Sequence, residues 1–218
     1  MVLKSLIPKY TLYLTWLLLF IGLGWSLYHQ QWTNSGLAAM TFILTLVPIF
    51  FQKKYTIYIS QSFISATALF IYGSVFLGEA NQFYEKYWWW DMFLHSMSAI
   101  GFGLVGVIFL LLAFGKSKNQ GSPFIFASFS FCFAVAIGVV WEIFEFSMDK
   151  TFGMDMQKSG LTDTMADLII DCIGAGIAAL AGYLYLIDFK YNIFWDIIDR
   201  NYLRNRALSR KHTESNKK

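Results

Sequence analysis

The stretch LTDTMADLIIDCIGAGIAALAGYLYLI, residues 161–187, decides the fold class of the chain. Crossing the ~30 Å hydrocarbon core of a bilayer takes about 20 helical residues, so this apolar run is long enough to span a membrane. Its first half nevertheless carries Asp163, Asp167 and Asp171 at intervals of four residues. At ~100° per residue, these three carboxylates fall on one face of a helix. The stretch therefore predicts a membrane-spanning helix with an acidic face near its start.

Five other apolar runs precede this one. The chain has 218 residues, of which 56% are hydrophobic and 14% charged, whereas a soluble domain carries about 25% charged residues. Backbone amides in lipid must be paired within a helix or across a closed barrel, and these runs lack the alternation of barrel strands. The sequence therefore predicts an all-α polytopic membrane protein. Its six transmembrane helices are expected near residues 10–28, 35–51, 55–78, 91–114, 123–148 and 163–187.

The distribution of positive charge predicts the orientation of these helices, because Lys and Arg concentrate in the cytoplasmic loops of membrane proteins. Most of the 17 basic residues precede the first span, lie between spans two and three or four and five, or follow the sixth. The exceptions are Lys86, Lys150 and Lys158, which lie in the alternate loops. Both termini are therefore expected in the cytoplasm.

The chain is expected to divide into a transmembrane domain, residues 1–188, and a cytoplasmic part, residues 189–218. The segment 189–203 mixes aromatic and aliphatic residues with charges, which predicts an amphipathic helix at the membrane surface. The basic and polar residues 206–218 predict disorder. Cys132 and Cys172 fall inside spans, so no disulfide framework is expected. The sequence contains no phosphate-binding loop or nucleic-acid module, so membrane lipids rather than nucleic acids are the expected partners.

Ionisable residues gather at the outer ends of the last three spans, within residues 87–186. They are Asp91 and His95 in span four, Glu142 and Glu145 in span five, and Asp163, Asp167 and Asp171 in span six. Small residues on the same arcs, such as Gly138 and Gly174, favour faces that turn toward other helices. The predicted orientation places all seven ionisable residues toward the non-cytoplasmic side. The sequence therefore predicts a shared polar cluster inside the bundle.

Several of these residues also have a plain structural explanation. Asp91 and Asp163 stand at helix starts, where a carboxylate caps the helix and favours its dipole. Glutamates near the interface can reach water, and His95 can serve as a buried ion-pair partner. Asp171 is harder to explain in this way, because a central Asp costs ~2.5–3.5 kcal/mol to insert into a membrane.

Six carboxylates and one imidazole cannot all be ionised in a medium of low dielectric constant, so either some are protonated or a cation binds among them. A divalent metal ion, Zn²⁺, Mn²⁺ or Mg²⁺, is the expected cofactor, because oxygen-rich sites with one imidazole suit these ions. His95, Asp163 and Asp167 are the expected ligands. Asp171 is expected either as a fourth ligand or as the partner that orients His95.

Three motifs resemble those of the YjdF-type family of bacterial membrane proteins. They are D-x-x-x-H at Asp91–His95, W-E-x-x-E at Trp141–Glu145 and D-T-x-x-D at Asp163–Asp167, followed by Gly174-Ala175. The pattern is also distantly similar to VanZ-like proteins, which have a Gln where Glu145 stands and an Asn where Asp171 stands. The YjdF-type resemblance implies a multi-pass protein of the bacterial cytoplasmic membrane without a settled activity. The VanZ-like similarity implies a link with the cell envelope.

Three functions remain open. The first is a metal-dependent hydrolase or transferase acting on an outer-leaflet lipid or cell-envelope precursor, with Glu142 or Glu145 as general base and Asp91 supporting the ligands. The second is a cation- or proton-coupled transporter that uses the same acids as a relay, although no polar path continues from Asp171 to the inner face. The third is a non-catalytic structural or regulatory membrane protein whose bundle is stabilised by a cation.

Overall fold

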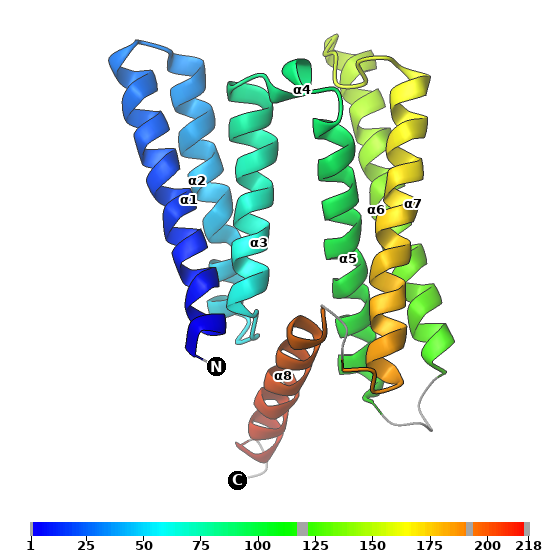
Figure 1. Ribbon diagram of the computed structural model, residues 1–218. Coiled ribbons are helices and arrows are strands. Elements are labelled where there is room, and N and C mark those ends of the chain that lie inside the picture. The colour runs from blue at the N-terminus through cyan, green and yellow to red at the C-terminus, as the bar shows by residue number, and fades with distance from the viewer. Residues whose placement is uncertain (1, 117–121, 191–193, 216–218) are drawn as a thin grey trace. The chain divides into compact units, whose positions relative to one another are not determined.

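The structure is a computed structural model, which describes residues 2–116, 122–190 and 194–215. All secondary structure within these ranges is helical (Figure 1). The elements are α1 (Val2–Tyr28), α2 (Trp32–Lys54), α3 (Gln61–Ile71), the π-helix η1 (Tyr72–Ala80), α4 (Phe83–Lys86), α5 (Trp90–Phe114), α6 (Pro123–Phe152), α7 (Leu161–Leu186) and α8 (Trp195–Ser215).

Six helical segments of the described chain are long and apolar enough to cross a membrane, so the predicted all-α architecture with six transmembrane helices is confirmed. They are Ile7–Tyr28, Trp32–Lys54, Gln61–Ala80, Trp90–Phe114, Pro123–Phe152 and Leu161–Leu186. The second is longer than predicted and runs through Pro48 to Lys54. The third begins only at Gln61, because the Ser60 side chain accepts a hydrogen bond from the Phe63 amide and caps the helix.

The chain folds into two compact units. Unit 1 comprises residues 1–90 and 203–218, and unit 2 comprises residues 91–202. The boundary falls within α8, whose first two turns belong to unit 2. The predicted division at residue 188 separates a transmembrane part from a cytoplasmic part, whereas the two compact units are defined by packing. That division, like the cytoplasmic location of both termini, stays a prediction.

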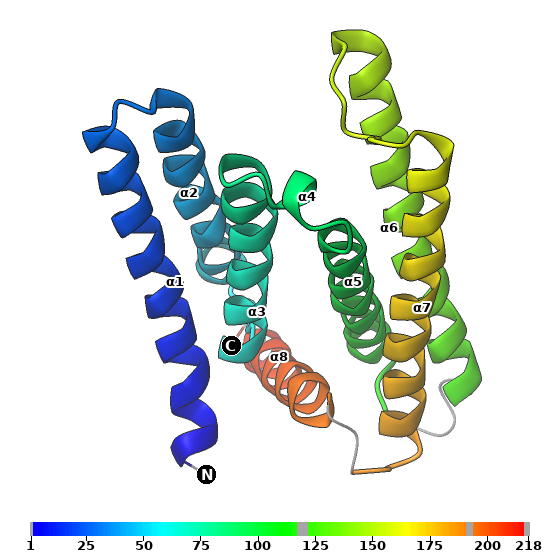
Figure 2. The ribbon, with the colours of Figure 1, turned by 45° about the horizontal axis from the view of Figure 1, so that its top comes forward.

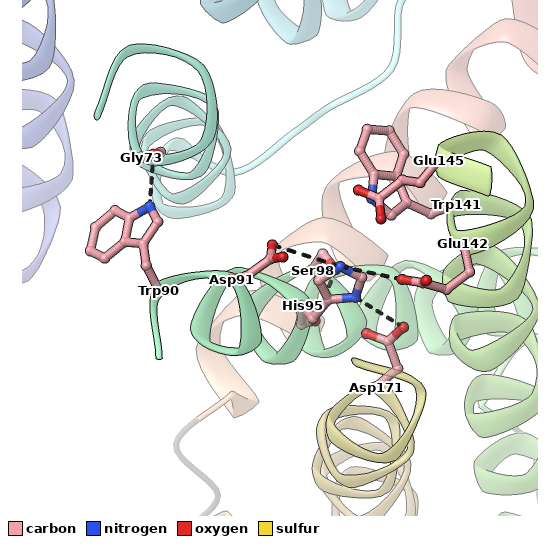
Figure 3. A network of polar contacts seen from close by, with 9 residues as sticks. All are labelled: Gly73, Trp90, Asp91, His95, Ser98, Trp141, Glu142, Glu145 and Asp171. Carbon is pink, nitrogen blue, oxygen red and sulfur yellow. Dashed lines mark hydrogen bonds and ion pairs between the residues drawn. The ribbon is translucent and has the colours of Figure 1, made fainter. Parts of the chain in front are cut away.

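Polar contacts join the helices of unit 1. Trp16 Nε1 donates a hydrogen bond to Thr45 Oγ1 at 2.9 Å, which connects α1 to α2. At the end of α3 the backbone widens into η1, where the carbonyl of Gly73 accepts a hydrogen bond from Trp90 Nε1 at 3.2 Å (Figure 3). In a π-helix each backbone amide bonds to the carbonyl five residues earlier instead of four. Such segments are frequent at functional sites. The indole of Trp90 is thereby fixed at the start of α5.

Unit 2 contains α5, α6 and α7, which approach closely because small residues line their contacts. A Cβ at Gly103 would overlap the side chain of Ala178, and a Cβ at Gly182 would overlap that of Val107. Ser130 Oγ donates a hydrogen bond to the carbonyl of Gly103 at 2.8 Å, which ties α6 to α5. This close packing brings side chains from three helices within reach of one another.

The first turns of α8 complete the core of unit 2. Ile198 is 0% exposed and Tyr202 is 2% exposed. Both belong to an apolar cluster with residues of α5 and α7, including Leu111 and Tyr185. The helix begins at Trp195, later than the predicted start at residue 189, and this part of its apolar face packs on protein. Its predicted location at the membrane surface stays a prediction.

The helix α8 continues well past the predicted end of the amphipathic segment. In unit 1, the Asn205 side chain accepts a hydrogen bond from the Tyr58 amide and donates one to the Tyr58 carbonyl, each at 2.7 Å. The helix extends to Ser215, so the prediction of disorder after residue 205 is wrong over this range. The paired Asn205 amide anchors the middle of the helix, which composition alone did not reveal.

Candidate metal centre

The predicted polar cluster lies where the start of α5, the last third of α6 and the start of α7 meet at one end of unit 2 (Figures 1 and 2). The loop between α6 and α7 fixes their register. The carboxylate of Asp149 accepts hydrogen bonds from the amides of Met156 and Gln157 at 2.8 and 2.9 Å. The Gln157 side chain donates to Thr164 Oγ1 at 2.6 Å. The acidic faces of α6 and α7 are therefore held beside each other by the connection itself.

The imidazole of His95 is the centre of the cluster. Its Nδ1 lies 3.3 Å from Asp171 Oδ2 on α7. Its Nε2 lies 3.7 Å from Glu142 Oε1 on α6 and 4.0 Å from Asp91 Oδ1, one turn earlier on α5 (Figure 3). His95 is only 6% exposed. One buried ring therefore contacts carboxylates from three separate helices.

The position of Asp171 depends on a glycine in α6. A Cβ at Gly138 would overlap the Asp171 carboxylate, so only glycine leaves this space open. On the other side of the same turn of α7, Gly174 lies against the carbonyl of Ser96. The backbones of α5 and α6 therefore both approach α7 at the level of Asp171.

Three residues present ligand atoms close enough to hold a metal ion. One ligand atom each from Asp91, His95 and Asp167 lie within 4.8 Å of one another. Because Asp171 engages Nδ1, the nitrogen left for a metal is Nε2, the usual arrangement in which a carboxylate orients a histidine ligand. Two carboxylates and one imidazole suit Zn²⁺ or Mn²⁺, and the oxygen ligands also suit Mg²⁺. The donor set therefore fits the expected class of ion.

Glu142 adds a second observation that points to a ligand. It is 4% exposed, and neither of its carboxylate oxygens has a hydrogen-bond partner among the described residues. Asp171 Oδ1 is unpaired in the same way. Buried polar groups are normally hydrogen-bonded, and each exception needs an explanation, such as a catalytic role or a bound water or ion. By contrast, Glu145 Oε1 accepts a hydrogen bond from Trp141 Nε1 at 2.9 Å (Figure 3).

The structure distributes the predicted site residues differently from the sequence analysis. Asp91, expected beside the ligands, belongs to the group that can hold a metal, together with His95 and Asp167. Asp163, expected as a ligand, is partly exposed and lies outside that group. Asp171 occupies the position of the partner that orients the imidazole. The roles of all these residues stay predictions.

Trp141 opens the W-E-x-x-E motif, and the sequence alone predicts no role for it. It stands four residues before Glu145, a spacing at which side chains on a helix meet. That spacing was the available signal for their hydrogen bond. The contact of Gly138 with Asp171 had no comparable signal, because it depends on how α6 and α7 pack.

Comparison with known families finds one family model that matches most of the chain. The model of the family described as "Predicted membrane protein (DUF2238)" matches residues 10–188. The chain belongs to the DUF2238 family. The matched range contains every residue of the candidate metal centre. This DUF2238 protein is a membrane protein with six apolar helices.

One relative of this DUF2238 protein is an uncharacterized protein of Thermotoga maritima, which is 35% identical over 112 residues. The aligned part is 50% of this chain and 57% of the relative, so the chain spans little more than half of that protein. No solved structure matches. The similarity to VanZ-like proteins expected from the motifs is not shown by these matches.

Proposed function

We propose that this DUF2238 protein binds a divalent metal ion through Asp91, His95 and Asp167 and uses it to hydrolyse or transfer a group on a lipid or envelope precursor. The protein would act in a bacterial cytoplasmic membrane, at the non-cytoplasmic side where the predicted orientation puts the cluster. The observation that carries the proposal is the buried His95, whose two nitrogens face Asp171 on one side and Asp91 and Glu142 on the other.

The charge balance of the cluster supports a bound cation. Buried carboxylates are costly unless they are paired or coordinate a metal. The neighbours of His95 bring three acidic side chains to one imidazole, so a single proton on the ring cannot neutralise them. A divalent ion adds the missing positive charge at the point where the ligand atoms converge.

The chain's own residues can divide the work of a hydrolytic step. A divalent ion supplies Lewis-acid stabilisation of negative charge and activates water. Asp171 holds the His95 ring in one orientation, which keeps Nε2 directed at Asp91 and Glu142. Glu142, whose oxygens have no hydrogen-bond partner among the described residues, is the better candidate for general base. Glu145 is the weaker candidate, because Trp141 already engages it.

A non-catalytic site that stabilises the bundle is the second candidate. It is favoured by the burial of the cluster, since Asp167 and Asp171 are only 2% and 1% exposed. Transport is less favoured by the packing. Toward the other end of unit 2, Val107 and Leu111 are fully buried in an apolar cluster with residues of α7 and α8, and no buried Asp, Glu or His is found there among the described residues. A transporter would need polar groups along that route.

Metal analysis of the purified full-length protein tests the proposal. We expect a stoichiometric transition metal or Mg²⁺ in the wild type. The Asp167→Asn variant should lose at least ~10-fold in metal affinity, since even changes around a metal's ligands commonly cost ~10–100-fold. Asp163→Asn is the matched control, because Asp163 is one turn earlier on the same face and outside the metal-binding group; it should retain the ion. A folded wild type that binds no divalent ion would refute the proposal.

The enzyme and the structural site differ in a second measurement. Glu142→Gln keeps the size of the side chain but cannot accept a proton as a base. If Glu142 is the base, the variant should bind metal and should lose hydrolysis of lipid or envelope-precursor substrates. If the metal is structural, no wild-type turnover will be found with any substrate of these classes, and metal will control only stability.

A further inference from the structure

The exposed face of α8 carries a cluster of arginines. They are Arg200, Arg204, Arg206 and Arg210, and all four are exposed. At ~100° per residue they occupy an arc of about 160° on the helix. We refer to this set as the arginine face.

The other side of α8 is already used for packing. Ile198, Asn201 and Tyr202 are buried, and Asn205 is paired with the Tyr58 backbone. The helix therefore cannot rotate to place this side in lipid without breaking its contacts with the protein. The four arginines lie on the opposite side of the helix and are exposed, with the Arg204 guanidinium 5.7 Å from the centroid of the Tyr58 ring.

Basic residues outnumber acidic ones on this side of α8. Within residues 195–210 of α8, the one exposed acidic side chain is Asp196, four residues before Arg200. Four arginines against one carboxylate leave the face with a net charge of about +3, counting each ionised group as one unit. Leu203, which is 52% exposed, and Ala207 lie between the arginines on the same arc. The surface is therefore basic, with a small apolar centre.

The start of α8 is tied to the end of the sixth apolar helix. Lys116 Nζ lies 2.7 Å from Asp188 Oδ1, directly after α7. The same ammonium group lies 4.1 Å from the centroid of the Tyr185 ring on α7 and 4.8 Å from that of Trp195 on α8. Cations are attracted to the faces of aromatic rings in this way. The first turn of α8 is therefore held close to the end of α7, the last of the six apolar helices.

We propose that the arginine face binds the anionic phospholipid headgroups of the leaflet next to the end of α7. Guanidinium groups bind phosphate through paired hydrogen bonds, and anionic lipid attracts basic segments beside transmembrane helices. The attachment is electrostatic, because the buried apolar side of α8 contacts protein. Added salt should therefore weaken this attachment. Salt should have much less effect on an amphipathic helix that inserts into lipid through its apolar face. The proposal does not depend on the metal centre.

Lipid-headgroup quenching in nanodiscs tests this surface. A fluorophore is attached at Ala207→Cys in the full-length protein, with Cys132 and Cys172 replaced by Ala so that no other thiol reacts. The lipid is phosphatidylcholine with or without phosphatidylglycerol, and a trace of lipid carries a quencher on its headgroup. We expect stronger quenching with phosphatidylglycerol, and we expect added salt to reverse the difference.

Two double variants separate charge from structure. Arg200→Gln with Arg210→Gln should weaken the binding of phosphatidylglycerol headgroups to the arginine face by about 25-fold, at about fivefold for each arginine. Arg200→Lys with Arg210→Lys keeps the charge and should retain most of the lipid-dependent quenching. Asp196→Asn should increase it. Equal quenching in both lipids, or a glutamine variant indistinguishable from the lysine variant, would overturn the proposal; an unchanged helix content by circular dichroism excludes unfolding as the cause.

Discussion

The carboxylate of Asp171 fills the space that a side chain at Gly138 would need. This contact sets the depth of Asp171 between α5 and α6, and Asp171 in turn holds Nδ1 of His95 at 3.3 Å. The orientation of the imidazole is therefore determined partly by the absence of a methyl group on a neighbouring helix.

Gly138→Ala should displace Asp171 and release the His95 ring. Overpacking a close contact costs ~1–3 kcal/mol, so we expect a lower melting temperature and weaker metal binding, measured by thermal unfolding and metal analysis. Gly101→Ala is the matched control, because a Cβ at Gly101 in α5 meets nothing within 4 Å. It should leave stability unchanged or raise it by up to ~1 kcal/mol. Equal behaviour of the two variants would contradict the proposed role of Gly138.

Chelator should destabilise the wild type more than Asp167→Asn. A ligand that binds the native state stabilises it by mass action, and removal of the ligand reverses this gain. At a metal concentration about 100 times the dissociation constant the gain is about 2.7 kcal/mol. The comparison requires melting curves of both proteins with and without chelator. The wild type could instead melt at the same temperature with and without chelator, while Asp167→Asn is more stable. That result would mean that the aspartates of α7 bind protons or contribute to packing rather than binding a metal.

Glu142→Gln should stabilise the protein when metal is removed. Without a cation, the buried Glu142 oxygens have no hydrogen-bond partner among the described residues, and leaving such a group unpaired costs ~1–3 kcal/mol, or more when it is charged. A neutral amide lowers that cost. The expected result is a higher melting temperature than the wild type in chelator. Glu145→Gln should show no such gain, because Trp141 donates to Glu145 at 2.9 Å.

Impermeant thiol reagents test the orientation of the helices. In a background without Cys132 and Cys172, cysteines at Asn34 and Ser159 should react from the non-cytoplasmic side. A cysteine at Ser209 in α8 should react only after the membrane is opened. Protection of Ser159 in intact cells, with reaction at Ser209, would mean that the true orientation is the reverse of the predicted one. The candidate metal centre would then lie on the cytoplasmic side.

The helices could be predicted from sequence because each depends on a local property, the length of an apolar run. The gathering of acidic residues could also be predicted, since Asp91, Glu142 and Asp171 all stand near corresponding ends of their spans. The sequence could not show which carboxylate faces which nitrogen of His95. That choice depends on the rotation of α6 and α7, which small contacts such as Gly138 with Asp171 control.

The sequence predicts Asp163 rather than Asp91 as a ligand, whereas the structure groups Asp91 with His95 and Asp167. This difference also depends on how the helices rotate and pack. Asp91 and Asp163 both stand in the first turn of a helix, so helical periodicity gives each the same description. The extension of α8 escaped prediction for a different reason. It involves Asn205 and Tyr58, which are 147 residues apart in the chain. No local pattern around Asn205 could have revealed that partner.

The separation of His95 and Asp171 by 76 residues has a consequence for biosynthesis. A ribosome makes α5 and α6 before α7, so His95 and Glu142 enter the membrane while Asp167 and Asp171 are still being synthesised. During that interval the imidazole lacks Asp171, its neighbour at Nδ1, and Asp167, one of the proposed ligands. The centre can first be completed when the last apolar helix has been inserted. Metal loading would therefore mark the end of membrane insertion, and pulse-labelled chains truncated before α7 should be the ones that quality-control proteases remove.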